Sequence, residues 1–392
     1  MPSVCLYFQV HQPYRLRPQS VFHIGSHHKY WNKRLNQSVL NRVVEHCYLP
    51  ANEVILSQIQ KHEGRFRVAY SLSGVLIEQL ENQHPAVLDS FRRLADTGCV
   101  EFLAETYYHS LSFLYQREEF LRQVLLHRDK IKSFFGQEPR VFRNTELIYQ
   151  NHLAFFVSQM GYAGILAEGT QEGLYGRSPN YLYHPTHLEK TKLLLRNYAL
   201  SDDVSFRFGD RKWIHFPLHT DVYAGWIASQ HGEVVCIGMD YETFGEHHKE
   251  SSGILKFLEA LPKAVLQTGG IDFQTPSQIF EKYATHGVYD ASRFQSWAGT
   301  DKDITPWLGN EMQEEAMQKI YALGAIVREK NSPELTREWS LLQTSDHFYY
   351  MATKTGAEAN VHAHFSPWKS PYDAYICFMS ALADFQIKLR KA

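Results

Sequence analysis

The sequence lacks a surplus of charge of either sign. Its 392 residues include 40 Lys and Arg against 42 Asp and Glu, which leaves a formal net charge of −2. A protein that binds nucleic acid through its phosphates usually carries a basic excess, so this balance argues against that class. Hydrophobic residues make up 44% and charged residues 21%, which is the composition of a folded chain rather than a disordered one.

The sequence also has few cysteines and no long apolar run. The five cysteines are widely spaced and form no Cys-x-x-Cys pair, so we expect reduced, mostly buried thiols. No stretch of about 18 apolar residues occurs, and we expect no membrane span. The first ten residues show neither a basic leader nor a cleavage site, which predicts a cytoplasmic protein.

Three catalytic signatures are missing as well. The chain has no Gly-rich phosphate loop, no serine elbow and no His-Glu-x-x-His pattern, so nucleotide-driven, serine and zinc-protease chemistry have no support. The conspicuous features are aromatic residues at 14% and 21 histidines. Rings at this density are typical either of a large packed core or of a groove that stacks against a flat, hydroxylated ligand.

Short apolar runs alternate with amphipathic segments over the first two thirds of the chain. The clearest helix is predicted over 118–135, where apolar residues recur with a period near 3.6 before Gly136 ends it. Buried runs separated by helices are typical of parallel strands with crossover connections, so we expect an α/β fold. The predicted strands are Val4–Val10, Arg67–Ser71, Val100–Ala104, Val141–Asn144, Gly164–Ala167 and Val234–Met239.

The character of the sequence changes after residue 298. Beyond it we predict helices over 310–330, 332–354 and 371–391 and no strand. Residues 1–298 are therefore predicted as the catalytic domain and 299–392 as a C-terminal helical domain. The segment 181–230 has weak periodicity, and we predict it as a loop-rich insert over the active face.

Polar side chains follow four of the predicted strands, at the point where each strand ends. In parallel β/α folds, reactive side chains gather at this edge of the sheet. A polar group left unpaired and buried there would cost about 1–3 kcal/mol, so its presence needs a reason. The four ends read His11 to Pro13, Glu105 to Leu111, Asn144 to Tyr149 and Asp240 to His248.

Two carboxylates, Glu146 and Asp240, stand at such strand ends and should face the same opening. Paired carboxylates in one cleft are the usual equipment for glycoside cleavage, in which one attacks the anomeric carbon and the other protonates the leaving oxygen. Either residue alone would more often be a surface salt-bridge partner. Their shared position favours the catalytic interpretation.

Five segments follow one another along the chain: HQP at 11–13, AETYYHSL at 104–111, RNTELIY at 143–149, MDYETFGEH at 239–247 and REWSLLQTSDHF at 337–348. Together they resemble the ordered signature regions of glycoside hydrolase family 57, over most of the chain. The resemblance implies a retaining enzyme acting on α-glucans. It also implies a (β/α)7 barrel, an incomplete TIM-like barrel, followed by a C-terminal helical region that completes the active-site cleft.

The resemblance implies roles for individual residues too. It makes Glu146 the nucleophile and Asp240 the general acid/base, the pair that the strand ends had selected. His11 and His109 match substrate-contacting positions. Two further substrate-binding candidates occupy positions where related enzymes often carry an aromatic ring; these are Arg143 and His247.

The fifth segment lies on a predicted helix, from which Trp339 and Asp346, with Arg337, could reach over the barrel mouth and complete the acceptor side. The alternative for Trp339 is a buried stripe with neighbouring Leu and Phe residues. Trp213 and Trp226, in the predicted insert, are either platforms for sugar rings or core residues.

Glu242 stands two residues after Asp240, and an extended backbone would put both side chains on one face. A second carboxylate there would keep the pKa of Asp240 raised through like-charge repulsion, and Glu242 is thus a candidate for the substrate site. The alternative is that Glu242 pairs with an arginine or a backbone amide.

The resulting prediction is a retaining hydrolase of the α-amylase type, acting on α-1,4-glucans or malto-oligosaccharides with no cofactor and no metal. A 4-α-glucanotransferase or a glucan branching enzyme would use the same site, since only the acceptor of the glycosyl group differs. A metal-dependent carbohydrate deacetylase with ligands His11, His109 and Asp240 would leave Glu146 unused. A catalytically silent glucan-binding protein would need neither carboxylate.

Overall fold

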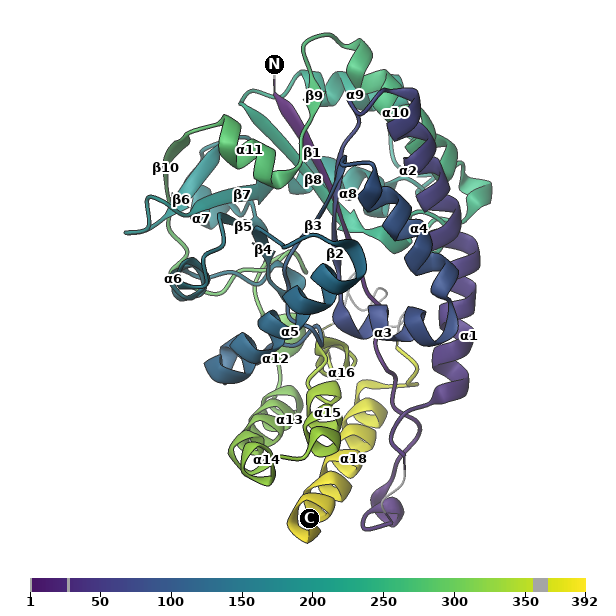
Figure 1. Cartoon of the computed structure of the whole chain (residues 1–392), viewed down its shortest axis with the longest axis vertical. Coiled ribbons are helices and arrows are strands. Elements are labelled where there is room, and N and C mark those ends of the chain that lie inside the picture. Colours follow the sequence, from purple (N-terminus) through teal and green to yellow (C-terminus); the bar gives the residue numbers. More distant parts are fainter. Residues whose placement is uncertain (1, 27–28, 355–365) are drawn as a thin grey trace.

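The computed structural model describes residues 2–26, 29–354 and 366–392. Its centre is a set of seven parallel strands, and helices connect most of them in sequence order (Figure 1). These strands are β1 (Ser3–Val10), β2 (Val68–Leu72), β3 (Val100–Phe102), β4 (Val141–Arg143), β5 (Gly164–Glu168), β7 (Lys192–Arg196) and β8 (Val234–Asp240). All six predicted strands are confirmed, with ends that differ by one or two residues.

The strands follow one another around a barrel. β1 pairs with both β8 and β2, β2 pairs with β3, and a second series runs from β4 through β5 to β7. Two seams are narrow: β7 meets β8 through the single pair Arg196 and Cys236, and β3 meets β4 through a single bridge between Ala104 and Phe142. The architecture is the predicted (β/α)7 barrel.

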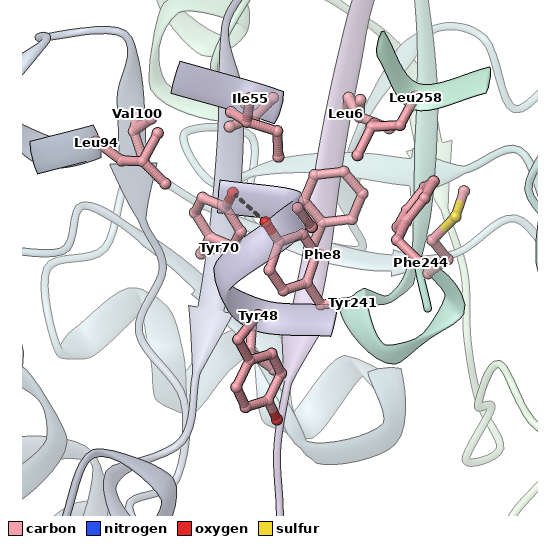
Figure 2. Close-up of a cluster of buried hydrophobic side chains, with 14 of the residues drawn as sticks. Leu6, Phe8, Tyr48, Ile55, Tyr70, Leu94, Val100, Tyr241, Phe244 and Leu258 are labelled. Carbon is pink, nitrogen blue, oxygen red and sulfur yellow. Dashed lines mark hydrogen bonds between the residues drawn. The ribbon is translucent and has the colours of Figure 1, made fainter. Parts of the chain in front are cut away.

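Aromatic side chains fill the core between β1, β2 and the covering helices. Figure 2 shows Phe8 against Tyr70 and Tyr241, with ring centroids 5.6 and 5.0 Å from that of Phe8. β1, β2 and β5 are buried along their whole length, as strands of a parallel sheet covered on both faces must be. The main helices in the barrel part of the chain are α1 (Lys33–Val43), α2 (Leu49–Lys61), α3 (Gly74–Gln83), α4 (Pro85–Asp96), α5 (Arg117–Phe135), α6 (Asn151–Gln159) and α10 (Ile254–Gln267).

The segment 181–230 differs from the predicted loop-rich insert. It contains β6 (Leu182–Pro185), β7, α8 (Tyr198–Asp202) and α9 (Thr220–Ala228), and β7 is one of the barrel strands. β7 reads KLLLR, whose apolar run is too short to give a strand signal by itself. β6 runs antiparallel to β7, and β10 (Thr285–Tyr289) pairs with β6 outside the barrel.

The part of the chain after residue 298 is helical, as predicted, and no strand occurs among its described residues. The predicted helix over 310–330 divides into α13 (Glu311–Ala322) and α14 (Gly324–Lys330), and that over 332–354 into α15 (Pro333–Leu341) and α16 (Ser345–Tyr349). The longest helix is α18 (Pro371–Lys391). Figure 1 shows these helices, with α12 (Thr305–Leu308), at the end of the barrel opposite the start of β1.

All five cysteines are buried with free thiols, which confirms the expectation from their spacing. In the ranges the structure covers, no helix combines the length and the apolar character that crossing a bilayer requires.

The helical region has its own apolar core around Trp339, and this core predicts the effect of a deletion. Trp339→Ala should lower the free energy of unfolding by about 3–5 kcal/mol, because it removes a fully buried ring and leaves a cavity. Urea denaturation followed by far-UV circular dichroism measures this change. Tyr372→Ala, at an exposed position of α18, is the control and should change it by less than about 0.5 kcal/mol. Equal effects of the two substitutions would contradict the assignment of Trp339 to the core.

Candidate active site

Glu146 lies immediately beyond β4, on the single turn η4 (Thr145–Leu147). Its backbone is left-handed, with φ 57° and ψ 24°, a conformation that non-glycine residues adopt at a cost of order 1–3 kcal/mol. The backbone N–H of Trp297 donates to the carbonyl oxygen of Glu146 at 3.2 Å and helps to hold this turn. Such a strained turn aims the carboxylate, whose side chain is 20% exposed, into the opening of the barrel.

Three side chains from separate segments hold the carboxylate of Glu146. The indole N–H of Trp297 donates to Oε2 at 2.8 Å, His109 Nε2 lies 3.3 Å from Oε1, and the Ser345 hydroxyl lies 3.5 Å from Oε1. Burial alone would raise the pKa of Glu146, but the hydrogen bond and positive charge of His109 and the charge of Arg143 outweigh it. The pKa of Glu146 is therefore lowered, and the group is ionised near neutral pH.

His109 lies between two carboxylates. Its Nδ1 is 2.9 Å from Oε2 of Glu105, and its Nε2 faces Glu146. Burial alone would lower the pKa of His109, but the two carboxylates raise it to about 10, so the ring is protonated and donates from both nitrogens. Glu105, which is fully buried, also accepts from Gln9 and Ser71, and its own pKa is lowered although burial opposes this.

His11, at the end of β1, stacks on His109 with ring centroids 4.1 Å apart. Its Nδ1 is 2.7 Å from the Ser73 hydroxyl, and its Nε2 is 3.1 Å from Oδ2 of Asp346. Burial and the neighbouring charge of His109 lower the pKa of His11. Burial alone would raise the pKa of Asp346, but His11 and His109 hold it well below its usual range. The structure thus places Asp346 of the helical region beside His11, which follows β1.

Asp240 is the last residue of β8, and its carboxyl has the opposite character to that of Glu146. Burial and the negative charge of Glu146 raise the pKa of Asp240 to about 7, against the opposing charges of Arg143 and His109. One carboxyl is therefore ionised near neutral pH, while the other, with its raised pKa, still holds a proton there in part of the molecules. Two carboxyl groups with pKa values pushed apart can divide the roles of nucleophile and acid.

Arg143 contacts the ring of Trp297, whose indole N–H is hydrogen-bonded to Glu146. The Arg143 guanidinium lies 4.6 Å from the ring centroid of Trp297, and that of Arg196 lies 5.6 Å from it. Arg143 is 0% exposed, so the predicted contact between its side chain and a sugar is wrong. Its role is electrostatic, since its charge lowers the pKa values of both Glu146 and Asp240.

Glu242 does not have the role that its sequence position suggested, which was to raise the pKa of Asp240 through like-charge repulsion. It lies on the turn η6 (Tyr241–Thr243), where it accepts from the Tyr48 hydroxyl and from Gln12 Nε2 at 3.3 Å. Burial and the charge of Asp240 raise the pKa of Glu242 to about 8. It is therefore mostly neutral near pH 7, and the carboxylate that raises the pKa of Asp240 is Glu146 instead. His247 is half-buried beyond η6, and its backbone N–H donates to the Glu242 carbonyl at 2.9 Å.

Two predicted substrate-binding tryptophans lie elsewhere. Trp339 is 0% exposed, and its indole N–H donates to the Ile320 carbonyl at 2.8 Å within the helical core, so a sugar contact there is wrong. Trp226, on α9, lines a pocket with Trp213 to which none of the carboxylates above contributes. Figure 1 shows α9 beside α10 at the end of the barrel where β1 begins, away from the helical region.

Sequence reasoning missed Trp297, Glu105 and Ser345. Glu105 and Ser345 stand inside two of the five segments, AETYYHSL and REWSLLQTSDHF, so the motif positions could have indicated them. Trp297 stands outside all five, in a loop after β10, and no pattern in the sequence marks it.

The histidines that a metal-dependent deacetylase would need are already engaged. Each ring nitrogen of His11 and His109 faces a partner side chain: Ser73, Asp346, Glu105 or Glu146. Among the residues the structure describes, no group of three or more His, Cys, Asp or Glu side chains is placed to hold a metal ion. Hydrogen bonds and charge therefore account for the orientation of both rings.

Comparison with known proteins points to one family. The family model for glycosyl hydrolase family 57 matches residues 5–292. A Methanocaldococcus jannaschii protein named "Putative alpha-amylase" is 40% identical over 397 residues, covering 98% of this chain and 84% of that protein. Two solved structures share the fold at 16% identity. A branching enzyme from Thermococcus kodakaraensis matches with a TM-score of 0.69, and the match covers 93% of this chain and 87% of that enzyme. The 4-alpha-glucanotransferase from Thermococcus litoralis matches with a TM-score of 0.65, over 88% of this chain and 56% of that enzyme.

The electrostatic coupling between Glu146 and Asp240 can be tested without substrate. Glu146→Gln removes the negative charge that helps to raise the pKa of Asp240, so that pKa should fall from about 7 towards, but not to, its ordinary value, because burial remains. Carbon-13 NMR titration of the labelled aspartate carboxyl follows the change. Glu242→Gln is the matched control, since Glu242 is mostly neutral, and should leave the pKa of Asp240 nearly unchanged. A larger shift with Glu242→Gln than with Glu146→Gln would refute the coupling.

Proposed function

The chain belongs to glycosyl hydrolase family 57, and on that premise we propose that it cleaves α-1,4-glucans with retention of configuration, as an α-amylase. The observation that carries this proposal is the opposite shift of two carboxyl groups in one site. The pKa of Glu146 is lowered and that of Asp240 is raised to about 7. An ionised nucleophile beside a protonated acid is what double displacement at an anomeric carbon requires.

In the first step, the carboxylate of Glu146 attacks the anomeric carbon while Asp240 transfers its proton to the glycosidic oxygen. The carbon–oxygen bond to the leaving glucan breaks, and a glycosyl ester of Glu146 forms. In the second step, the carboxylate of Asp240 takes a proton from water, the water oxygen attacks the anomeric carbon, and Glu146 leaves as a carboxylate. Asp240 ends protonated and Glu146 ionised, so the site returns to its starting state.

The neighbours of Glu146 support these roles. Protonated His109 and the Trp297 N–H stabilise the carboxylate that must leave in the second step. Asp346 and His11 stand beside them, with side chains 21% and 9% exposed. We assign to these two side chains the hydrogen bonds to the sugar hydroxyls. His109 is the more deeply buried of the two histidines and contributes through its charge. On this proposal the helical region, residues 299–392, completes the substrate cleft.

One observation favours an α-amylase over a transferase, and two others fit a glucan-active protein of either kind. The M. jannaschii relative, which is 40% identical, carries an α-amylase name, whereas the branching enzyme and the 4-alpha-glucanotransferase match at 16% identity. A neutral glucan also suits a chain whose net charge is −2. The five buried free thiols suit a reducing compartment, and we propose the cytoplasm.

Maltoheptaose is the substrate that tests the function. We expect the wild-type protein to yield only shorter malto-oligosaccharides, resolved by size, with the α-anomer formed first in proton NMR. Products longer than maltoheptaose would show glucosyl transfer instead. A loss of activity with chelator would support a metal-dependent enzyme. A protein inactive on maltoheptaose and on glycogen would end the proposal.

Substitution of the nucleophile gives a sharper outcome. Glu146→Gln should lower kcat by at least about a thousandfold, because no covalent intermediate can form, while the far-UV circular dichroism spectrum stays that of the wild type. Glu242→Gln, which removes another buried carboxyl, should keep a much larger share of activity. If Glu146→Gln retains a tenth of the wild-type rate, Glu146 is not the nucleophile.

The pH profile should report both carboxyl groups. Because Asp240 must be protonated to act as the acid, kcat/KM should fall as the pH rises through about 7. Because Glu146 must be ionised, activity should be lost at low pH, below the ordinary pKa of a glutamate. Trp297→Phe replaces the indole with a smaller aromatic ring and removes the hydrogen bond to Oε2, so it should move the acidic limb to higher pH and leave the alkaline limb nearly in place. An unchanged acidic limb would mean that Trp297 does not position the nucleophile.

A further inference from the structure

An open pocket of about 450 Å³ lies between α8, the turn η5 (Asp203–Arg207) and α9. The residues that matter to its chemistry are Asp203, Arg207, Trp213, His215, Trp226 and Gln230. Its size is within the range of about 300–1,000 Å³ that is typical of small-molecule sites. None of the residues that surround Glu146 and Asp240 lines it.

Three rings form the apolar part of this pocket. The ring centroids of Trp213 and Trp226 are 6.1 Å apart at 70°, and the ring of His215 stands edge-on to both, at 5.3 and 4.8 Å. Both indoles are only partly buried, with one side against the barrel core and the rest in the pocket. Exposed indole surface beside polar groups suits the apolar face of a sugar ring, as aromatic side chains with one wet side do at recognition sites.

The polar part of the pocket is balanced in charge. Arg207 Nε lies 2.9 Å from Oδ1 of Asp203, and the same guanidinium lies 5.9 Å from the ring centroid of Trp213. The guanidinium already occupies the cation site over that ring, which disfavours a cationic ligand. The carboxylate neutralises it, which removes the attraction for an anion. Donors and acceptors without net charge, next to indole rings, match an uncharged polyhydroxylated ligand.

The pocket is also held in place by the fold. The Tyr223 hydroxyl donates to the Leu200 carbonyl at 2.8 Å and ties α9 to α8. Asn180 and Asn197 both donate to Oε1 of Gln230, at 3.0 and 3.3 Å. These bonds fix the walls before a ligand arrives, so little ordering entropy is lost on binding.

The position of the pocket separates it from the catalytic cleft. Gln230 precedes the first residue of β8, Val234, by four positions, whereas Asp240 is the last residue of that strand. The seven residues of β8 span roughly 23 Å. We propose that Trp213 and Trp226 form a second carbohydrate site, which holds a neutral glucan chain away from the cleft. The choice of glucan as the ligand rests on the proposed function, and the pocket itself does not.

The test uses Glu146→Gln protein, in which the ligand is not consumed, and isothermal titration with maltoheptaose. We expect binding at two sites, and loss of one of them in the variant that also carries Trp213→Ala and Trp226→Ala. Trp226→Phe should retain most of the binding, because a ring still packs on Tyr223. The matched control is Ile214→Ala, at an 88% exposed position of the same loop that does not line the pocket.

Activity gives a second measurement that does not depend on calorimetry. With Glu146 intact, the Trp213→Ala/Trp226→Ala protein should turn over maltotetraose within about twofold of wild type, but its kcat/KM on glycogen should fall by about tenfold, since long chains alone can use both sites. The second site is overturned if the Trp213→Ala/Trp226→Ala pair changes neither the number of maltoheptaose molecules bound in the titration nor the rate of glycogen hydrolysis. A wild-type protein that binds maltoheptaose at the pocket but hydrolyses no glucan would overturn the proposed function and leave the site standing.

Discussion

The charged hydrogen bonds of His109 hold the active site together. This imidazole lies between Glu105 and Glu146, and the two carboxylates keep it protonated against the effect of burial. Its charge in turn keeps Glu146 ionised and opposes protonation of His11, which stacks on it. If His109 were neutral, two buried carboxylates would face each other across an uncharged ring, and burial would raise the pKa of both. The opposite pKa shifts of Glu146 and Asp240 depend on this one proton.

The helical region is part of the same arrangement. The Ser345 N–H donates to the His109 carbonyl at 2.9 Å, and Thr344 forms a bridge with Ser110. The neighbouring Asp346 then reaches His11. The start of α16, with Thr344 before it, thereby sets the backbone of His109 and supplies a carboxylate beside His11. The barrel and the helices consequently both contribute side chains around His109 and Glu146.

Sequence reasoning located this site where polar residues interrupt a regular pattern. The positions of Glu146 and Asp240 after apolar strands mark them, and Asp346 is marked by its place in the fifth of the segments that resemble the family's signature regions. Arg143 was misjudged, since nothing in the sequence tells that a guanidinium is buried under an indole ring. Trp297 and β7 were missed for a related reason. Each is defined by contacts with segments distant along the chain, and neither a loop tryptophan nor a short KLLLR run carries a periodic signal.

The hydrogen bonds of the site also help to join β3 and β4, which meet at a narrow seam. One bridge, between Ala104 and Phe142, joins the two strands, and side-chain contacts cross the seam beyond it. The hydroxyls of Thr106 and Thr145 lie 2.7 Å apart there, and His109 meets Glu146. The wall of the barrel is thus held at this point by hydrogen bonds that include the proposed nucleophile. On the proposed mechanism Glu146 loses its charge each time it becomes an ester, so the His109 hydrogen bond across this seam should weaken and re-form once in every turnover.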